Sequence, residues 1–232
     1  MISVIIPAFN EEAEIKSTIR RIFGAADRSL IREIIVVDGG STDNTVNEAE
    51  QAGAKVIASP EKGRAPQLNA GAKAAVSDIL YFLHADSIPP QNFTQDIIFA
   101  VHKGFESGCY RLAFDYDHWF LKANCWFTRF NINAVRFGDQ SLFVSKRVFE
   151  KAGGFDESLI VMEDQEIISR IRQYSKFIVM KKQVITSARK YLDNGFFKMQ
   201  AIFTLIYLMY KLGYSQQSLL KTYRHLIHQN KL

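Results

Sequence analysis

Cysteine is scarce in this chain, and its placement excludes several kinds of site. Cys109 and Cys125 are the only two cysteines among 232 residues, and their spacing matches neither a zinc-binding CxxC pair nor a disulfide framework. We expect both to be buried thiols in a reducing compartment. A charged and apolar leader with a small-residue cleavage site is also missing. The sequence therefore predicts no signal peptide and a cytoplasmic protein.

Several motifs and patterns that would assign a function directly are absent. The chain has no GxGxxG and no GxxxxGK[ST], so neither a dinucleotide-binding fold nor a P-loop is indicated. It shows no internal repeat and no recognisable nucleic-acid-binding module, and we expect no nucleic acid as partner. Residues 196–210 are mostly apolar, but Lys198 and Lys211 bracket far fewer than the ~20 residues of a membrane-spanning helix.

Acidic residues are nearly absent from the last third of the chain. From residue 170 to 232 there are twelve Lys or Arg and one acid, Asp193, so this segment carries +11. Because the whole chain carries +5, residues 1–169 carry −6. A basic tail on an acidic domain predicts an anionic membrane surface or a phosphate ligand as partner. The remaining composition, 47% apolar and 23% charged, is that of an ordinary globular protein.

The first half of the chain alternates short apolar runs with helical patterns. Strands are expected over residues 2–7, 34–37, 55–58 and 79–83, and each of them ends in a polar loop. Helices are expected between them, the first capped by Asn10 and the second by Asp43 or Asn44. Alternation of this kind predicts an α/β fold, a Rossmann-like, mostly parallel sheet with helices on both faces.

The second half is less regular. Helices are expected over residues 91–103 and 120–132, and strands over 108–114 and 141–145. The helix at 120–132 carries Trp126, Phe127 and Phe130 at helical spacing. Aromatic residues in such a stripe usually pack in a core, and we expect these to do so.

Two aspartates lie just beyond predicted strands. The run at 79–83 stops at His84-Ala85-Asp86, and the run at 34–37 leads straight into Asp38. Ligands of open α/β sheets bind beyond the carboxyl ends of the strands, so Asp86 could hold a hard divalent cation there. The alternative is that Asp86 only caps the turn before Pro89.

Charged residues at two predicted helix starts also admit two interpretations. Lys62 and Arg64 precede a small-residue helix, where they form either an anion site or a solvated basic turn. Glu163 and Asp164 begin another helix after a glycine-rich turn. Acids at this position complement the helix dipole, but one of them could also face a cleft as a general base.

Four blocks in this order resemble a family 2 glycosyltransferase with the GT-A fold: residues 3–12, residues 36–43, Leu83-His84-Ala85-Asp86 and Glu163-Asp164. His84 stands where the family has the first aspartate of its metal motif. The resemblance implies Mg²⁺ or Mn²⁺ as cofactor, held by Asp86 with His84. It also implies that Asp164, beside Glu163, is the catalytic base. The residues that it implies for donor nucleotide binding are Pro7, Ala8, Asn10, Glu11, Asp38, Gly39, Lys62, Arg64, His84 and Ala85.

A narrower resemblance adds the remaining site residues. Phe137-Gly138-Asp139-Gln140, Met162-Glu163-Asp164 and residues 186–190 are similar to a small bacterial subgroup, the radical-SAM/selenodomain-associated transferase 2 proteins. The resemblance implies that Gly138, Asp139 and Gln140 bind the acceptor and that Arg189 contacts the donor diphosphate.

The resemblance implies an inverting transfer of a sugar from a nucleotide-diphosphate sugar to an acceptor hydroxyl, for which a lipid-linked acceptor is one candidate. We expect a transferase domain at 1–190, with a donor half at 1–105 and an acceptor half at 106–190. A basic and apolar helical tail at 191–232 would pack on that domain or lie on the inner face of the cell membrane. The alternatives are a nucleotidyltransferase-like enzyme and a degenerate, non-catalytic nucleotide-binding protein.

Overall fold

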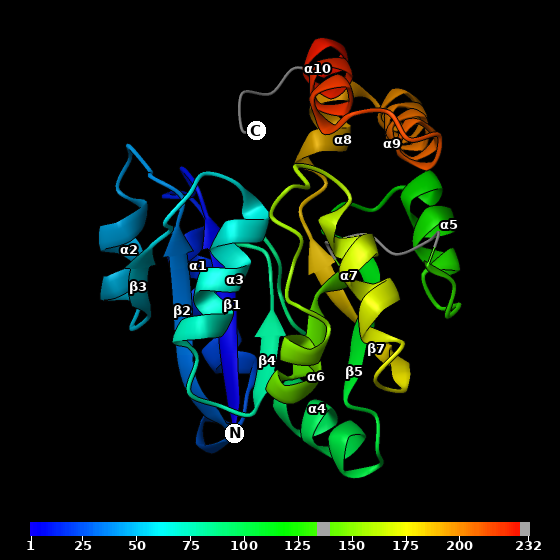
Figure 1. Ribbon diagram of the computed structural model, residues 1–232. Coiled ribbons are helices and arrows are strands. Elements are labelled where there is room, and N and C mark those ends of the chain that lie inside the picture. Colours follow the sequence, from blue (N-terminus) through cyan, green and yellow to red (C-terminus); the bar gives the residue numbers. More distant parts are fainter. Residues whose placement is uncertain (134–139, 228–232) are drawn as a thin grey trace.

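The computed structural model describes residues 1–133 and 140–227. Within these ranges, seven strands form one sheet in the order β3-β2-β1-β4-β6-β5-β7 (Figure 1). The strands are β1 (Ile2–Ala8), β2 (Ile31–Asp38), β3 (Lys55–Ala58), β4 (Ile79–Phe82), β5 (Ser107–Phe114), β6 (Leu142–Ser145) and β7 (Phe177–Thr186).

Helices connect most of these strands. They are α1 (Ile15–Ala25), α2 (Thr45–Gln51), α3 (Arg64–Ala74), α4 (Phe93–His102), α5 (Trp119–Phe127), α6 (Lys146–Lys151), α7 (Glu163–Ile171), α8 (Arg189–Asn194), α9 (Phe196–Lys211) and α10 (Gln216–Leu226). In the part of the chain that the structure describes, no helix is both long and apolar enough to cross a membrane.

The sheet is mostly parallel, as predicted. β1 pairs in parallel with β2 and β4, and β2 pairs in parallel with β3. β6 is the exception, because it runs antiparallel to both of its neighbours, β4 and β5. β7 pairs in parallel with β5 at one edge of the sheet.

Apolar side chains cover both faces of the sheet. On β1, Val4 and Ile6 belong to a cluster with α1 and α4, whereas Ile5 belongs to a second cluster with α3, α6 and α7. The alternation follows from the two-residue period of a strand. α3 lies close to the sheet because residue 71 is glycine: a Cβ there would be 2.4 Å from Cγ2 of Ile5. The predicted α/β architecture with helices on both faces is confirmed.

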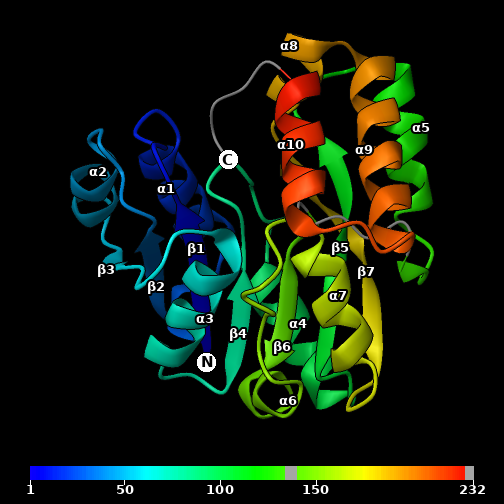
Figure 2. The same cartoon turned by 45° about the horizontal axis from the view of Figure 1, so that its top comes forward.

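The C-terminal helices form a third apolar cluster with α5. Met199, Ile202 and Ile206 of α9 pack there with Leu219 of α10 and Leu121 of α5. Figures 1 and 2 show α8, α9 and α10 beyond the carboxyl ends of the parallel strands, with α9 beside α5. The predicted C-terminal helical segment is therefore present, and its division from the rest at residue 190 stays a prediction.

The helix expected over residues 120–132 is shorter than predicted. α5 ends at Phe127, because the Thr128 hydroxyl donates a hydrogen bond to the carbonyl of Cys125 (2.6 Å) and accepts one from the backbone N–H of Leu112 in β5 (3.0 Å). A contact this distant in sequence cannot be read from a local pattern.

The expectation that the aromatic stripe packs in the core was wrong. Trp126, Phe127 and Phe130 are exposed, and the helix instead turns Leu121 and Cys125 inward. Both cysteines are buried thiols that form no disulfide, as predicted.

Candidate active site

The loops that carry the predicted donor residues leave one edge of the sheet. In the parallel register, Ala8 of β1 lies opposite Asp38 of β2, and Ile5 lies opposite Phe82 of β4. The chain that follows each strand therefore emerges at the same edge. Asn10 and Asp86 lie in these loops, and Asp38 is the last residue of β2.

The loops after β1 and β2 are hydrogen-bonded to each other. The Asn10 side-chain oxygen accepts from the backbone N–H of Thr42 (2.9 Å), and the Asn10 N–H donates to the Ser41 hydroxyl (2.9 Å). The Asp38 carboxylate accepts from the N–H groups of Gly40 and Ser41, both at 3.1 Å. These hydrogen bonds hold the two loops together.

The predicted capping role of Asn10 was wrong. α1 begins only at Ile15, and Asn10 has a left-handed backbone with a φ of 53°. The Asn10 side chain forms its hydrogen bond with the neighbouring loop and not with the start of α1.

A buried amide from α3 fastens the ends of β1 and β2. The Gln67 Nε2 donates to the carbonyls of Ala8 (2.8 Å) and Val37 (2.9 Å), and the residue is 6% exposed. Gly39 is required beside it, because a Cβ there would be 2.8 Å from Gln67 Nε2. Sequence analysis missed Gln67, and no local signal distinguishes it from the other polar residues of α3, Arg64, Asn69 and Lys73.

Asp86 carries a half-buried carboxylate with no hydrogen bond or ion pair to any residue that the structure describes. Two hydrogen bonds fix the loop around Asp86. The Thr18 hydroxyl donates to the Ala85 carbonyl (2.6 Å), and the Ser87 hydroxyl donates to the Thr186 hydroxyl (3.1 Å). The carboxylate makes no bond that would cap the turn. Within residues 1–133 and 140–227, no three His, Cys, Asp or Glu side chains gather as a metal cluster. A cation at Asp86 would therefore need further oxygen ligands from substrate and water, as Mg²⁺ sites in proteins often have.

Arg64, the first residue of α3, forms ion pairs with the first two residues of α7. Its Nε lies 2.7 Å from Oε1 of Glu163, and its Nη2 contacts Oδ2 of Asp164. The Glu163 side chain is 5% exposed and that of Asp164 20%. The solvated-turn interpretation is therefore wrong for Arg64, whose charge is taken up by two carboxylates. These ion pairs bring the predicted base to the sheet edge that carries the donor loops.

The turn before α7 is held by Asn69 of α3 and by Arg170 of α7 itself. The Asn69 side chain accepts from the N–H of Phe155 and donates to its carbonyl, both at 2.8 Å. Arg170 donates to the carbonyl of Gly154 (2.6 Å). Met162, directly before Glu163, has a φ of 72°, an unfavourable conformation for a side chain of its size. Backbone strain of this kind clusters at functional sites. Asn69 is a second positioning residue that sequence analysis missed.

Two predicted cations have no partner within the described chain. Lys62 is exposed just before α3, and Arg189 is partly buried at the start of α8; neither side chain makes an ion pair or hydrogen bond with a described residue. Both remain available to an anionic ligand.

Other predicted residues are less accessible. Pro7 and Ala8 are buried at the end of β1, so their side chains shape the loop. Gln140 is 1% exposed and donates to the Tyr110 carbonyl (3.2 Å), which directs its amide into the fold. The other two predicted acceptor residues, Gly138 and Asp139, lie outside the described residues.

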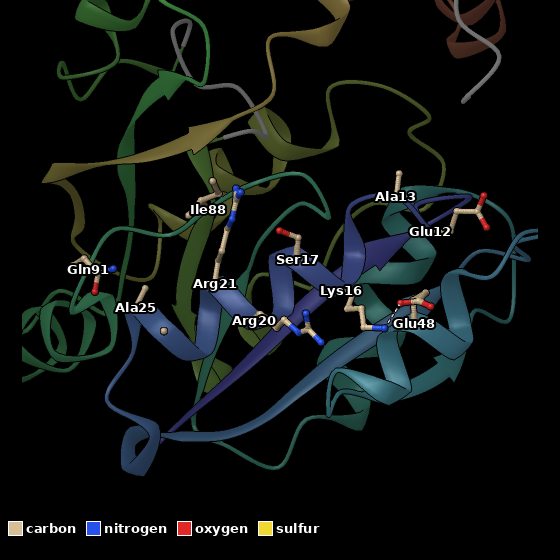
Figure 3. Close-up of a pocket in the computed structure, with 11 residues that line it drawn as sticks. Glu12, Ala13, Lys16, Ser17, Arg20, Arg21, Ala25, Glu48, Ile88 and Gln91 are labelled. Atoms are coloured by element: carbon tan, nitrogen blue, oxygen red, sulfur yellow. Dashed lines mark ion pairs between the residues drawn. The ribbon is translucent and has the colours of Figure 1, made fainter.

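A pocket of about 680 Å³ lies elsewhere, along the outer side of α1 (Figure 3). Lys16, Arg20 and Arg21 line it together with Glu12 and Glu48. None of the predicted site residues lines this pocket, although Glu12 directly follows one of them. The site residues predicted from the sequence therefore lie outside this groove.

Comparisons with known proteins identify related chains. The sequence model of Glycosyl transferase family 2 matches residues 3–148. Glucosyl-3-phosphoglycerate synthase of Mycobacterium tuberculosis is 41% identical over 97 residues, which cover 38% of this chain and 30% of the relative. Undecaprenyl-phosphate 4-deoxy-4-formamido-L-arabinose transferase of Shewanella sediminis is 28% identical over 114 residues, which cover 46% of this chain and 34% of the relative. The chain thus spans about a third of the length of these curated relatives.

A solved structure extends the likeness to nearly the whole chain. A mannosyltransferase from Pyrobaculum calidifontis, in complex with GDP-Man and Mn²⁺, superposes with a TM-score of 0.72 at 17% identity. The match covers 97% of this chain and 69% of that one. At this identity the likeness concerns the fold.

Proposed function

The chain belongs to glycosyl transferase family 2 and has the GT-A fold, and we propose that it transfers a sugar from a nucleotide-diphosphate sugar to an acceptor hydroxyl with inversion. The observation that carries this proposal is the ion pair between Arg64 and Asp164. It joins the helix after β3 to the predicted base, at the sheet edge where the loops after β1, β2 and β4 emerge. An inverting transfer needs a base and a donor site next to each other.

The donor would bind along the preformed loops. Asp38 and Gly39 would contact the nucleoside together with Asn10, while Lys62 and Arg189 would face the diphosphate. Asp86 would hold Mg²⁺ or Mn²⁺, assisted by His84, with donor oxygens completing the shell. The bound cation would neutralise charge on the departing diphosphate. The presence of Mn²⁺ and GDP-Man in the Pyrobaculum mannosyltransferase supports this assignment.

Asp164 would act as general base on the acceptor. Its Oδ2 faces Arg64, so the proposal assigns the proton of the acceptor hydroxyl to Oδ1. The oxygen would attack the anomeric carbon from the side opposite the diphosphate, which inverts the configuration. Glu163, nearly buried against Arg64, would hold the guanidinium in place and so position Asp164 indirectly.

The acceptor is assigned by class only. A hydroxyl on a lipid-linked acceptor is proposed, and the undecaprenyl-phosphate transferase among the relatives supports it. Gly138, Asp139 and Gln140 remain the proposed acceptor residues, and membership of the radical-SAM-associated subgroup stays a prediction. A location on the inner face of a membrane goes with this acceptor.

A thermal-shift screen tests the donor site. Nucleoside diphosphates are added with and without Mn²⁺ to the wild type and to Asp86→Ala. Asp78→Ala is the matched control, since Asp78 is an exposed aspartate at the opposite end of the same strand. A ligand at 100 times its dissociation constant should stabilise the wild type by about 2.7 kcal/mol. We expect a Mn²⁺-dependent shift with at least one nucleotide in the wild type and the control, lost in Asp86→Ala. No shift with any nucleotide would contradict the donor site.

A further inference from the structure

Helix α9 is apolar on two opposite faces. Met199, Ile202 and Ile206 face inward to the third apolar cluster. The opposite side carries an exposed stripe with helical spacing, made of Phe197, Ala201, Leu205, Leu208 and, at the helix end, Leu212. A helix of a globular protein normally turns a polar face to water. The outer stripe of α9 therefore indicates a second apolar environment.

Helix α5 lies beside this stripe and extends it. α5 and α9 run side by side (Figures 1 and 2). The Asn124 amide donates to Oε1 of Gln200 on α9 (3.0 Å), and the ring centres of Phe120 and Phe197 lie 4.7 Å apart. On the outer side of α5, Trp119 is 66% exposed and Trp126 47%. We call the following exposed side chains the α5–α9 surface: Trp119, Trp126, Phe127, Phe130, Phe197, Leu205, Leu208 and Leu212.

The charges around this surface are mostly positive, and one acid at its border, Asp117, pairs with Lys122 (2.6 Å). Residues 118–133 and 194–227 contain six Lys or Arg and no Asp or Glu. Two of these cations lie over aromatic rings: the Arg129 guanidinium is 4.5 Å from the Trp126 ring centre, and the Lys211 amine is 5.6 Å from that of Tyr207. Long basic side chains can cover apolar surface in this way while their charge reaches toward water or headgroups.

We propose that the α5–α9 surface docks on the interface of an anionic lipid bilayer. Exposed tryptophan, leucine and phenylalanine side chains, surrounded by lysine and arginine, are the composition that favours the headgroup region of such a membrane. Binding strength there grows with buried apolar area and with attraction to anionic lipids. The length of α9 limits it to lying on the bilayer, because its 16 residues are fewer than the ~20 that span one.

A bilayer fits this surface better than a second copy of the chain does. Apposing two copies would bring together two surfaces on which cations outnumber acids. An anionic headgroup layer supplies the opposite charge. The docking does not depend on sugar transfer, so it can be tested without an active enzyme.

The two tryptophans of the chain, Trp119 and Trp126, report on the docking directly, because both belong to this surface. The full chain is mixed with vesicles of phosphatidylglycerol and phosphatidylcholine, or of phosphatidylcholine alone. We expect a blue-shifted tryptophan emission and co-sedimentation with the anionic vesicles, both weakened by salt.

A double variant, Leu205→Ser with Leu208→Ser, keeps both reporters and removes exposed apolar groups from α9. The matched control is Val76→Ser with Phe99→Ser, which changes two exposed apolar residues away from the surface. We expect the partition coefficient of the α9 variant to fall at least about tenfold and that of the control to stay within about twofold of the wild type.

Three results would overturn the proposal. They are no binding of the wild type to anionic vesicles, equal partitioning of the wild type and the α9 variant, and a sedimentation-detected dimer of the wild type that the α9 variant abolishes. The last would assign the surface to a second copy of the chain.

Discussion

Arg64 on α3 forms an ion pair with Asp164 on α7, although exactly one hundred positions separate them in the chain. The same guanidinium contacts the nearly buried Glu163. These ion pairs connect the helix that follows β3 with the helix that carries the proposed base. They also mean that a donor diphosphate near Arg64 would compete with carboxylates already bound to it.

Removing Arg64 should destabilise the protein, and the size of the loss should depend on whether Glu163 is also replaced. Arg64→Ala leaves the Glu163 carboxylate buried without its cation, and we expect a loss of about 1–3 kcal/mol in the free energy of unfolding. Arg64→Lys should restore part of it, because lysine keeps the charge but not the planar fork. Urea denaturation of Arg64→Ala, Glu163→Gln and the double variant measures the coupling. Strictly additive losses would show that the ion pair contributes nothing.

Glycine at position 71 should be necessary for the packing of α3. In Gly71→Ala the new methyl group would lie 2.4 Å from Ile5 Cγ2, and we expect a loss of about 1–3 kcal/mol from overpacking. Gly24→Ala is the control: Gly24 lies in α1 with nothing within 4 Å of a new Cβ. The free energy of unfolding of that variant should rise by about 0.5–1 kcal/mol. Thermal unfolding separates the two, and a Gly71→Ala variant as stable as the wild type would contradict the close approach of α3.

The Gln67 amide should support the donor loops. Gln67→Leu removes two donors from the carbonyls of Ala8 and Val37, so we expect a loss of about 1–3 kcal/mol and a weaker affinity for the nucleotide. Isothermal titration with the nucleotide found in the screen measures the affinity. Gln217→Leu, an exposed substitution on α10, provides the comparison. Unchanged affinity in Gln67→Leu would show that the strand ends hold their geometry without this amide.

Acid should weaken the link between β5 and α6. Hydrogen bonds from Arg147 lower the pKa of Glu106 below its ordinary value of 4.5. Because the pKa is lower in the folded state, the stabilisation is present above pH 4.5 and is lost as the pH falls through the folded-state value. The difference in unfolding free energy between wild type and Glu106→Gln should be about 0.2–1 kcal/mol at pH 7 and shrink below pH 4.5. Urea titrations over this range, with exposed Glu150→Gln as control, measure it; a constant difference would contradict the ion pair.

Local patterns predicted the donor half of the sheet well. Each of β1 to β4 contains a short apolar run whose side chains join the first two apolar clusters, so its identity is largely contained in its own residues. Asp38 and Asp86 follow such runs, and the parallel register places the loops that carry them at one edge.

Features that depend on contacts between distant parts of the chain could not be predicted from local patterns. β7 was missed because Lys181 and Lys182 interrupt its apolar pattern: the register passes from Met180 opposite Tyr110 to Gln183 opposite Arg111, so both lysines bulge out of the edge strand. Lysines on an exposed edge discourage pairing with other chains. The ion pairs of Arg64 likewise could not be predicted from the sequence, because only the tertiary structure brings α3 and α7 together.

The role of Asp164 as catalytic base is the central claim, and the turnover of Asp164→Asn tests it most directly. UDP- and GDP-sugars are supplied with Mn²⁺ and with hydroxyl acceptors that include 3-phosphoglycerate and polyprenols, and release of nucleoside diphosphate is followed. We expect kcat to fall ~10²–10⁴-fold in Asp164→Asn, with the dissociation constant of the donor unchanged, and to stay at the wild-type value in Asp78→Asn. Equal turnover of Asp164→Asn and the wild type would contradict the account.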